Sequence, residues 1–163
     1  MADPVTITDF REGADGWRVI TDQVMGGVSE GQATLRKEMG HAYLELTGAV
    51  STANNGGFVQ ARYDLPERLP QDAGSLHLRV KGNGQRYFIH LRVRGAARPW
   101  HYYQAAFEAG PDWQQITLPF ASFRPSRDGL AQNIDPATIA SIALVAYGRD
   151  HEARVSLERI ELD

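Results

Sequence analysis

The stretch TDQVMGGVSEG, residues 21–31, has the composition of a loop that could bind an anion. Its glycine pair, Gly26 and Gly27, would let backbone N–H groups approach a phosphate closely. A nucleotide site would show GxGxxG after a strand or GxxxxGK[ST], and neither pattern occurs in the chain. No helical pattern follows the pair to lend its N-terminus to an anion. We therefore set phosphate binding aside.

The same stretch is better explained as a structural turn. Its apolar residues, Val24, Met25 and Val28, favour burial, and we expect them to close one end of the fold while the glycines reverse the chain. A partner-binding loop is the alternative. In that case, the polar side chains of the stretch would face the partner: Asp22, Gln23 and Ser29.

No catalytic or metal-binding pattern emerges elsewhere. The chain has no cysteine, no serine lies in a GxSxG elbow, and the five histidines are scattered without metal-ligand spacing. A glycosidase would need two carboxylates converging on one cleft, which spacing alone does not indicate. We predict no catalytic residue, no metal and no cofactor. A structural calcium ion stays open as an alternative, although no DxDxDG-type loop occurs.

Cationic and polar side chains recur on alternating positions of three short runs. We expect the runs around residues 75–81 and 85–94 to pair as a hairpin through the turn KGNGQ. One sheet face would then carry six outward residues: Gln60, Arg62, His77, Arg79, His90 and Arg92.

Such a face would hold several like charges, which repel each other across neighbouring strands. Arginine suits carboxylate and phosphate groups, so the face is a candidate for binding an anionic ligand or an acidic partner surface. Simple surface pairing with Asp64 and Glu108 is the alternative. Three aromatic residues, Trp100, Tyr102 and Tyr103, follow the expected hairpin and could line a groove for a sugar or a partner, or else pack in the core.

The elements that would position these residues are strands. Alternating apolar and polar runs cover residues 41–50, 57–65, 75–81, 85–94, 113–120, 141–148 and 155–162. Turn residues separate them, including the bend NNGG, for which we expect Asn55, Gly56 and Gly57 to be structural. The one helical turn expected starts at DPATIAS, where Asp135 would cap and Pro136 would occupy the first position. This pattern predicts an all-β sandwich of two antiparallel sheets.

Length and charge fit one ordinary globular domain. The 163 residues, 42% hydrophobic and 23% charged, predict a single domain over residues 1–163. A formal charge of −3 gives no drive toward nucleic acid. No membrane span and no signal peptide are evident, so we expect a cytoplasmic protein.

Several motifs together resemble the complex I intermediate-associated protein 30 family. They are GWRVITDQVMGGVSEG, NNGGFVQARYDL, VKGNGQRYFIHLR, YYQAAFEAGPDWQQITLPFASFRP, IASIALVAYG and VSLERIEL. The resemblance covers essentially the whole chain, and DQVMGGVS followed by NNGGF is its most specific part. The back half also resembles many carbohydrate-binding modules.

The resemblance implies a galactose-binding-like jelly roll and a non-catalytic, chaperone-like role in assembling a protein complex. The partners implied are proteins, such as respiratory complex subunits or assembly factors. The shortness of the chain and its bias to arginine over lysine suggest a bacterial-type homologue. Two other hypotheses remain: a carbohydrate-binding module that uses the aromatic residues and the polar face, and an enzyme of unrecognised type.

Overall fold

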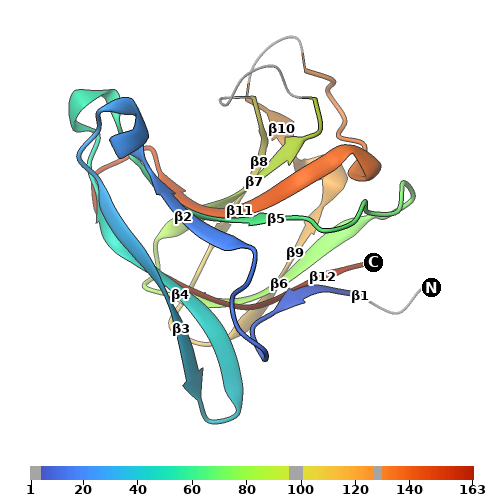
Figure 1. Ribbon diagram of the computed structural model, residues 1–163, viewed down its shortest axis with the longest axis horizontal. Helices are drawn as coiled ribbons and strands as arrows, with labels where there is room; N and C mark the ends of the chain where they lie inside the picture. The colour runs from blue at the N-terminus through green and yellow to red at the C-terminus, as the bar shows by residue number, and fades with distance from the viewer. Residues whose placement is uncertain (1–4, 96–100, 127–129) are drawn as a thin grey trace.

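A computed structural model describes residues 5–95, 101–126 and 130–163. In these residues, twelve strands form two six-stranded sheets, packed face to face as a sandwich (Figure 1). All the strand pairings are antiparallel. The predicted all-β sandwich is confirmed.

The first sheet, sheet A, has the strand order β3-β4-β12-β6-β9, and β1 pairs with β12 beside this path. Its strands are β1 (Val5–Asp9), β3 (Glu30–Glu38), β4 (His41–Val50), β6 (Ser75–Gly82), β9 (Gln114–Pro119) and β12 (His151–Leu162). The two ends of the described chain thus lie side by side (Figure 1).

The second sheet, sheet B, has the order β10-β8-β7-β11-β5-β2. Its strands are β2 (Trp17–Thr21), β5 (Phe58–Asp64), β7 (Arg86–Val93), β8 (Tyr103–Glu108), β10 (Arg124–Pro125) and β11 (Ile139–Tyr147). Four 3-10 turns complete the described structure: η1 (Asp22–Met25), η2 (Ala53–Asn55), η3 (Phe120–Ser122) and η4 (Pro136–Thr138). As expected, the Asp135 side chain caps η4 by accepting from the amide of Ala137.

The core lies between the sheets and is built by alternation along the strands. Leu46, Leu78 and Leu157 of sheet A face Ile89 and Leu144 of sheet B, and all five are fully buried. Because successive side chains of a strand point to opposite faces, burying this set turns the intervening polar residues outward. The outward set of sheet B includes four of the predicted binding residues, Gln60, Arg62, His90 and Arg92.

The turn at residues 81–85 does not form the predicted hairpin. β6 pairs with β12 and β9, whereas β7 pairs with β11 and β8, so the turn carries the chain from one sheet to the other. Backbone amides of the turn donate to strands elsewhere, with Asn83 N bonded to Arg154 O and Gly84 N to Ala109 O. The glycine-rich turn has the composition of a hairpin, but these contacts fix it as a corner of the sandwich.

Within the described residues, no helix is both long enough and apolar enough to cross a membrane.

Candidate functional site

The outer face of sheet B gathers most of the predicted cationic residues. Cross-strand register places Arg18 opposite Arg62, Arg62 opposite Ala143, and Ala143 opposite His90. One step along the strands, Arg92 lies opposite Ser141. We call this outward set the arginine face: Arg18, Gln60, Arg62, His90, Arg92 and Tyr102.

The floor of the arginine face is apolar and closed. Ala143 and Val145 on the central strand β11 have 0% and 1% of their surface exposed. Neighbouring side chains must therefore lie across these two residues, and their register neighbours are Gln60, Arg62 and His90. The polar groups are thus held against a dry floor, where charge interactions are stronger than in water.

Arg62 is an under-satisfied cation on this face. Its Nη2 group donates to Gln60 Oε1 at 3.4 Å, while its buried Nε finds no hydrogen-bond partner in the described part of the chain. Burial lowers the pKa of Arg62, and the charge of Arg18 lowers it further, against an opposing effect of Asp64. Arginine keeps its positive charge at neutral pH in proteins. The Nε–H group of Arg62 donates no hydrogen bond among the described residues.

His90 is buried and neutral. Only 4% of its surface is exposed, and burial, aided by the charge of Arg92, lowers its pKa to about 3. The ring hydrogen-bonds to Gln104, which favours protonation but is outweighed. Its other nitrogen, Nε2, has no partner among the described residues. A neutral ring that donates from Nδ1 to Gln104 leaves Nε2 as an acceptor.

Aromatic rings hold this constellation in place. The ring of Tyr102 stacks on that of His90, with the two centroids 4.0 Å apart. The guanidinium of Arg92 lies 5.5 Å from the centroid of the Tyr102 ring. On the other side, Tyr147 meets His90 edge-on at 5.3 Å and donates its hydroxyl to Gln104 Oε1 at 2.6 Å. This hydrogen bond from Tyr147 to the carbonyl oxygen of Gln104 fixes the orientation of the Gln104 side chain beside His90.

Arg92 adds a second buried cation. Burial and the charge of Arg62 lower the pKa of Arg92 to about 10, despite the opposing effect of Tyr102, so it is cationic at neutral pH. An ion pair at this face joins Arg18 to Asp64 at 3.5 Å, with both side chains more than half exposed. Such an exposed pair contributes little. Pairing with Glu108 is not seen, because Glu108 lies at the far end of β8 opposite Arg86.

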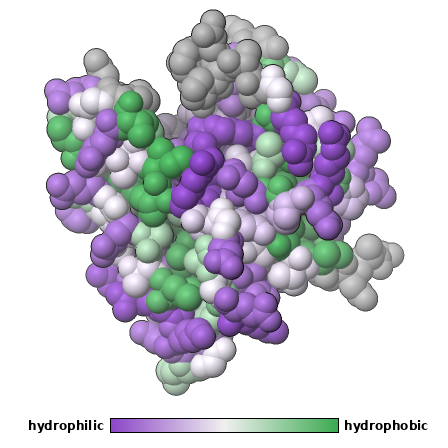
Figure 2. Space-filling model, viewed as in Figure 1, coloured by the Kyte–Doolittle hydropathy of each residue, from purple (hydrophilic) through white to green (hydrophobic). Residues whose placement is uncertain are grey.

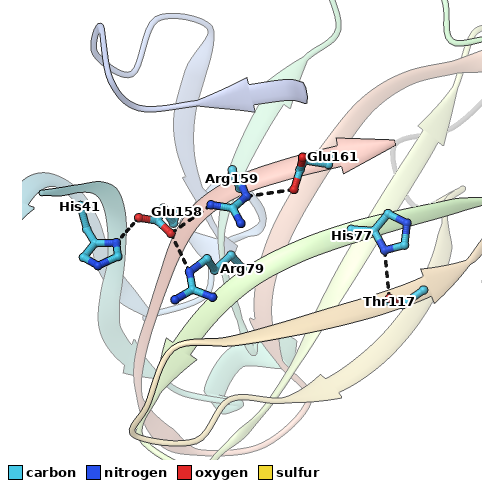
Figure 3. A network of polar contacts seen from close by, with 7 residues as sticks. All are labelled: His41, His77, Arg79, Thr117, Glu158, Arg159 and Glu161. Carbon is cyan, nitrogen blue, oxygen red and sulfur yellow. Dashed lines mark hydrogen bonds and ion pairs between the residues drawn. The ribbon is translucent and has the colours of Figure 1, made fainter. Parts of the chain in front are cut away.

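The structure removes His77 and Arg79 from this face. Both lie on β6 of sheet A, where His77 contacts Thr117 and Asp163 and Arg79 binds Glu158 at 2.8 Å. Figure 3 shows Glu158 between His41 and Arg79, with Arg159 and Glu161 continuing the network. The prediction that they join Arg62 and His90 is wrong, because it depended on the hairpin that does not form.

Of the three aromatic residues predicted to line a groove, the described structure places one, Tyr102, on the arginine face. Tyr103 has 3% of its surface exposed and points into the core, where its hydroxyl donates to Ala131 O at 2.7 Å. Trp100 lies outside the described residues. Tyr102 is on the arginine face, and Tyr147, which sequence analysis did not select, joins it there. Arg18 was also missed, since its strand is too short to show clear alternation.

The loop at residues 22–29 is organised around the carboxylate of Asp22. Asp22 is fully buried and accepts from the amide and hydroxyl of Ser29 and from the amides of Gly57 and Phe58. Burial raises the pKa of Asp22, but these hydrogen bonds outweigh that effect and hold it below the usual value. The Ser29 hydroxyl also bonds to the backbone of Ser51 at 2.8 and 3.1 Å.

Glycine is needed in both turns for one of two reasons: a side chain would collide with the Asp22 carboxylate, or the backbone has a positive φ. A Cβ atom on Gly27 would lie 2.4 Å from Asp22 Cγ, and one on Gly56 would lie 2.4 Å from Asp22 Oδ2. Gly26 and Gly57 instead have positive φ, at 85° and 126°. Asn55 ends η2. The prediction of a structural turn agrees with this geometry.

One detail of that prediction is wrong. Val24 and Val28 are 73% and 49% exposed and do not close the sandwich; the buried residues of the loop are Asp22, Gly27 and Ser29. Apolar surface accordingly shows at the end of the molecule where η1 and η2 lie (Figures 1 and 2). Gln23, exposed, donates to Ser29 O at 2.9 Å. Asp22, Gln23 and Ser29 thus bond within the chain, rather than presenting free groups to a partner.

No metal site accompanies these features. In residues 5–95, 101–126 and 130–163, no group of three or more His, Asp or Glu residues is placed to hold a metal ion. A hollow of about 510 Å³ lies away from the arginine face, beside β1, and is lined by Thr8, Asp9, Arg11, Glu12, Gly13, Asp15 and Tyr63.

Comparison with protein families gives one match that covers nearly the whole chain. Residues 8–158 match the family described as complex I intermediate-associated protein 30. A relative, the mitochondrial complex I intermediate-associated protein 30 of Mus musculus, is 24% identical over 156 residues, which is 84% of this chain. The chain spans about half of that protein, 47% of its length.

Three solved structures with the same fold are carbohydrate-binding modules. A family 11 module from Clostridium thermocellum, solved with a β-1,3-1,4-mixed-linked tetrasaccharide, superposes with a TM-score of 0.78 at 18% identity, covering 99% of this chain and 96% of the other. A family 11 module of a cellulosomal cellulase of the same organism gives 0.80 at 17% identity, covering 99% and 95%. A family 30 module gives 0.72 at 14%, covering 99% and 98%. The jelly-roll sandwich is confirmed.

Proposed function

The chain belongs to the complex I intermediate-associated protein 30 family, and from this premise we propose that it is a non-catalytic binding module that helps assemble a protein complex. Its working surface is the arginine face, which receives an acidic surface of the partner. The observation that carries the proposal is the grouping of Arg18, Arg62 and Arg92 on one outer face of sheet B, where the cross-strand register brings them together.

Electrostatics favours an acidic partner over a neutral one. Burial and the charge of Arg18 lower the pKa of Arg62, and burial and the charge of Arg62 lower the pKa of Arg92. Bringing carboxylates to the face relieves this repulsion and satisfies guanidinium N–H groups. The mouse relative is named a mitochondrial complex I intermediate-associated protein, so a subunit or assembly factor of a respiratory complex is the first partner class to test.

The absence of catalytic machinery in the described residues supports binding as the whole role. The buried carboxylate of Asp22 is used up by four hydrogen bonds, and His90 is too weak a base to accept a proton at neutral pH. The Ser29 hydroxyl is bonded to Asp22 and to the Ser51 backbone. None of these groups is placed beside an accessible nucleophile.

The test is quantitative capture of partners by purified variants. We expect Arg62→Gln with Arg92→Gln to lose at least tenfold in captured partner, because two buried charge-assisted contacts are removed, each contributing about 1.5–3 kcal/mol. The fold should survive, since the change removes two repelling, desolvated cations and keeps much of each side-chain stem. Melting temperature, measured on the same samples, checks that expectation.

The matched control is Arg79→Gln, which removes one cation from sheet A instead. Capture by this variant should equal that of the parent. The proposal is wrong if the double variant folds and captures the same partners in the same amounts, or if Arg79→Gln is the change that abolishes capture.

Carbohydrate binding is the second candidate. It is favoured by the half-buried aromatic pair of Phe88 and Tyr147, whose ring centroids lie 4.6 Å apart beside the arginine face. Titration with a β-1,3-1,4-mixed-linked tetrasaccharide, followed by calorimetry of parent and Tyr147→Ala, decides it. Saturable heat that disappears in the variant would establish this candidate, and a flat titration at millimolar sugar would remove it.

A further inference from the structure

Strand β3 forms one edge of sheet A and leaves its outer side open along nine residues. It stands first in the strand order of that sheet, and β4 is its one partner among the described strands. The β3–β4 hairpin also reaches beyond the neighbouring strands at one end of the sandwich (Figure 1). An open strand edge offers N–H and C=O groups that can pair with a strand of another molecule.

The other edges of the two sheets are shorter or interrupted. β2 has five residues, β9 has six and ends on Pro119, and β10 has two and ends on Pro125. β1 pairs with β12 through a register shift between Thr6 and Thr8. In contrast, β3 contains no proline and keeps an unbroken register with β4 over its whole length. Because short strands, prolines and bulges prevent edge pairing, β3 is the described edge best suited to accept a strand.

Charged side chains can also protect an edge, but most of those near the tip of β3 are matched within the chain. Arg36 binds Glu45 at 2.9 Å. Burial raises the pKa of Tyr43, and a side-chain hydrogen bond with Glu38 raises it further. Lys37 is left as the charge in this half of β3 that a pairing strand must accommodate.

The turn of the hairpin determines which backbone groups of β3 point outward. Met39 and Gly40 form a two-residue loop with positive φ at both positions, 48° and 82°, and Glu38 is paired with His41. In such a hairpin the residues next to the loop exchange both backbone hydrogen bonds, and the pattern then alternates along the strands. Three residues therefore direct their N–H and C=O groups away from β4: Ala33, Leu35 and Lys37.

A second copy of the same edge fits these outward groups in one particular register. When two β3 strands pair antiparallel about Leu35, this 39% exposed side chain lies against its own equivalent. The flanking pairs join Lys37 to Ala33 of the second copy, and Arg36 to Thr34 of the second copy. Across residues 32–38, no two like charges then lie directly opposite each other, and such oppositions are destabilising.

Three neighbouring registers oppose like charges. Centring the pair on Arg36 or on Lys37 would place that cation opposite its own equivalent. Centring it on Thr34 would place Glu38 opposite Glu30. Each of these registers would therefore be weakened by repulsion across the new strand pair.

A register centred on Ala33 avoids like charges but leaves apolar surface uncovered. Leu35 would then lie opposite Gly31, which has no side chain to cover it. Gly31 also belongs to the part of β3 that sheet B covers, because a Cβ atom there would lie 2.2 Å from Val59 Cγ1. Centring on Leu35 instead sets the projecting half of each hairpin beside the covered half of the other, which separates the two sandwiches.

We propose that two copies of the chain associate through β3, antiparallel and centred on Leu35, to form a symmetric dimer with a continuous sheet A. The three outward residues supply the main-chain hydrogen bonds, and the two Leu35 side chains extend the apolar row that begins at Leu44 of each copy. The association is weak, because so narrow an interface buries less than the roughly 1,200 Å² of stable complexes.

The symmetry of this dimer has a consequence for partner binding. A two-fold axis through two opposed Leu35 residues runs perpendicular to sheet A, so both copies of sheet B lie on the same side of it. The two arginine faces then point the same way, and a partner with two acidic sites is bound bivalently. This consequence rests on the proposed function, whereas the dimer itself does not.

The test is sedimentation velocity of the purified protein over concentrations from about 1 μM to about 1 mM, the range that reports weak association. We expect the weight-average mass to rise from that of the monomer towards twice that value. Leu35→Lys and Leu35→Glu should each stay monomeric, because each places like charges at the two-fold axis. An equimolar mixture of the two variants should recover the association, because unlike charges then face each other.

The register has a test of its own, since the chain contains no cysteine. In the proposed pair, the two Leu35 Cα atoms lie about 5.5 Å apart, which is within the range of a disulfide. Leu35→Cys should therefore form a covalent dimer under mild oxidation. Lys37→Cys should not, because each Lys37 lies opposite Ala33 of the second copy, roughly 13 Å along the strand from its own equivalent. Should Leu35→Lys fail to fold, this pair of variants decides the same question.

Val24→Lys is the matched control, since it places a cation at a valine that is 73% exposed on η1, away from Leu35. It should associate as the parent does. A parent that stays monomeric at the highest concentration, or a mixture of the two Leu35 variants that does not associate, would refute the dimer. Cross-linking of Lys37→Cys in preference to Leu35→Cys would refute the register. Partner capture by the arginine variants judges the proposed function separately.

Discussion

At the scale of single residues, Asp22 and His90 are both buried and polar but differ in how fully the chain satisfies their hydrogen bonds. Asp22 is surrounded by donors from two loops and has its charge fully used inside the chain. His90 is surrounded by cations and aromatic rings and keeps one nitrogen unused. The first is a structural residue in a segment that suggests chemistry, whereas the second lies on an ordinary strand within the face that we propose for binding.

Asp22→Asn should destabilise the protein strongly. An amide has one acceptor oxygen, and its NH₂ group would face the amide of Ser29 or Gly57, leaving buried donors unmet. We expect a loss of about 2–4 kcal/mol in the free energy of unfolding, measured by urea denaturation. The control is Asp150→Asn, whose exposed carboxylate accepts from Thr52. If both variants lose equally little, Asp22 does not organise the loop.

His90 should make the fold sensitive to mild acid. Its folded pKa of about 3 lies below the ordinary value of 6.5, so the unfolded chain binds the proton first as pH falls. The folded state therefore loses stability through the window from about pH 6.5 down to about 3, by about 2 kcal/mol at pH 5. His90→Phe should lose less between pH 7 and 5. Parallel pH profiles of parent and variant would contradict the assignment.

At the scale of elements, the glycine pair shows two different reasons for the same residue. Gly26 is needed for a positive φ with open space around it, whereas Gly27 is needed because its hydrogen faces Asp22. Two constraints therefore fix the turn. One is the left-handed backbone at Gly26, and the other is the Asp22 carboxylate, which joins η1 to the loop after η2.

Alanine at the two positions should separate these reasons. Gly26→Ala should cost about 1–2 kcal/mol, the strain of a left-handed residue. Gly27→Ala should cost more, because its Cβ would displace the Asp22 carboxylate and its hydrogen bonds. Thermal unfolding of both variants gives the order. The reverse order would mean that the carboxylate can move aside without loss.

The elements also show what a sequence can predict. Alternation located β4, β5, β6, β7, β9, β11 and β12 to within a few residues, because burial of one face imposes that pattern. It missed β1, β2, β8 and β10, which are short, and β3, which is largely exposed at the edge of its sheet. Pairing was the weaker part, since the glycine turn after β6 is compatible with a hairpin and with a corner.

At the scale of the whole molecule, one pairing error divided the predicted site. Gln60, Arg62, His90 and Arg92 share sheet B as expected, but His77 and Arg79 belong to the opposite sheet and are neutralised there by carboxylates. The outer surface of sheet A is therefore a network of ion pairs (Figure 3), while sheet B keeps buried cations close to one another. We propose that this asymmetry between the two faces directs a partner to one side of the sandwich.

The measurement that tests this claim most directly is the arginine side-chain NMR spectrum during titration with a captured partner. The account predicts that the Nε–H resonances of Arg62 and Arg92 shift in a saturable manner and that those of Arg79 and Arg159 stay in place. Added salt should weaken the shift, because charge pairs at an interface rim are screened. Saturable shifts of Arg79 and Arg159, with Arg62 and Arg92 unmoved, would place the binding surface on sheet A and contradict the account.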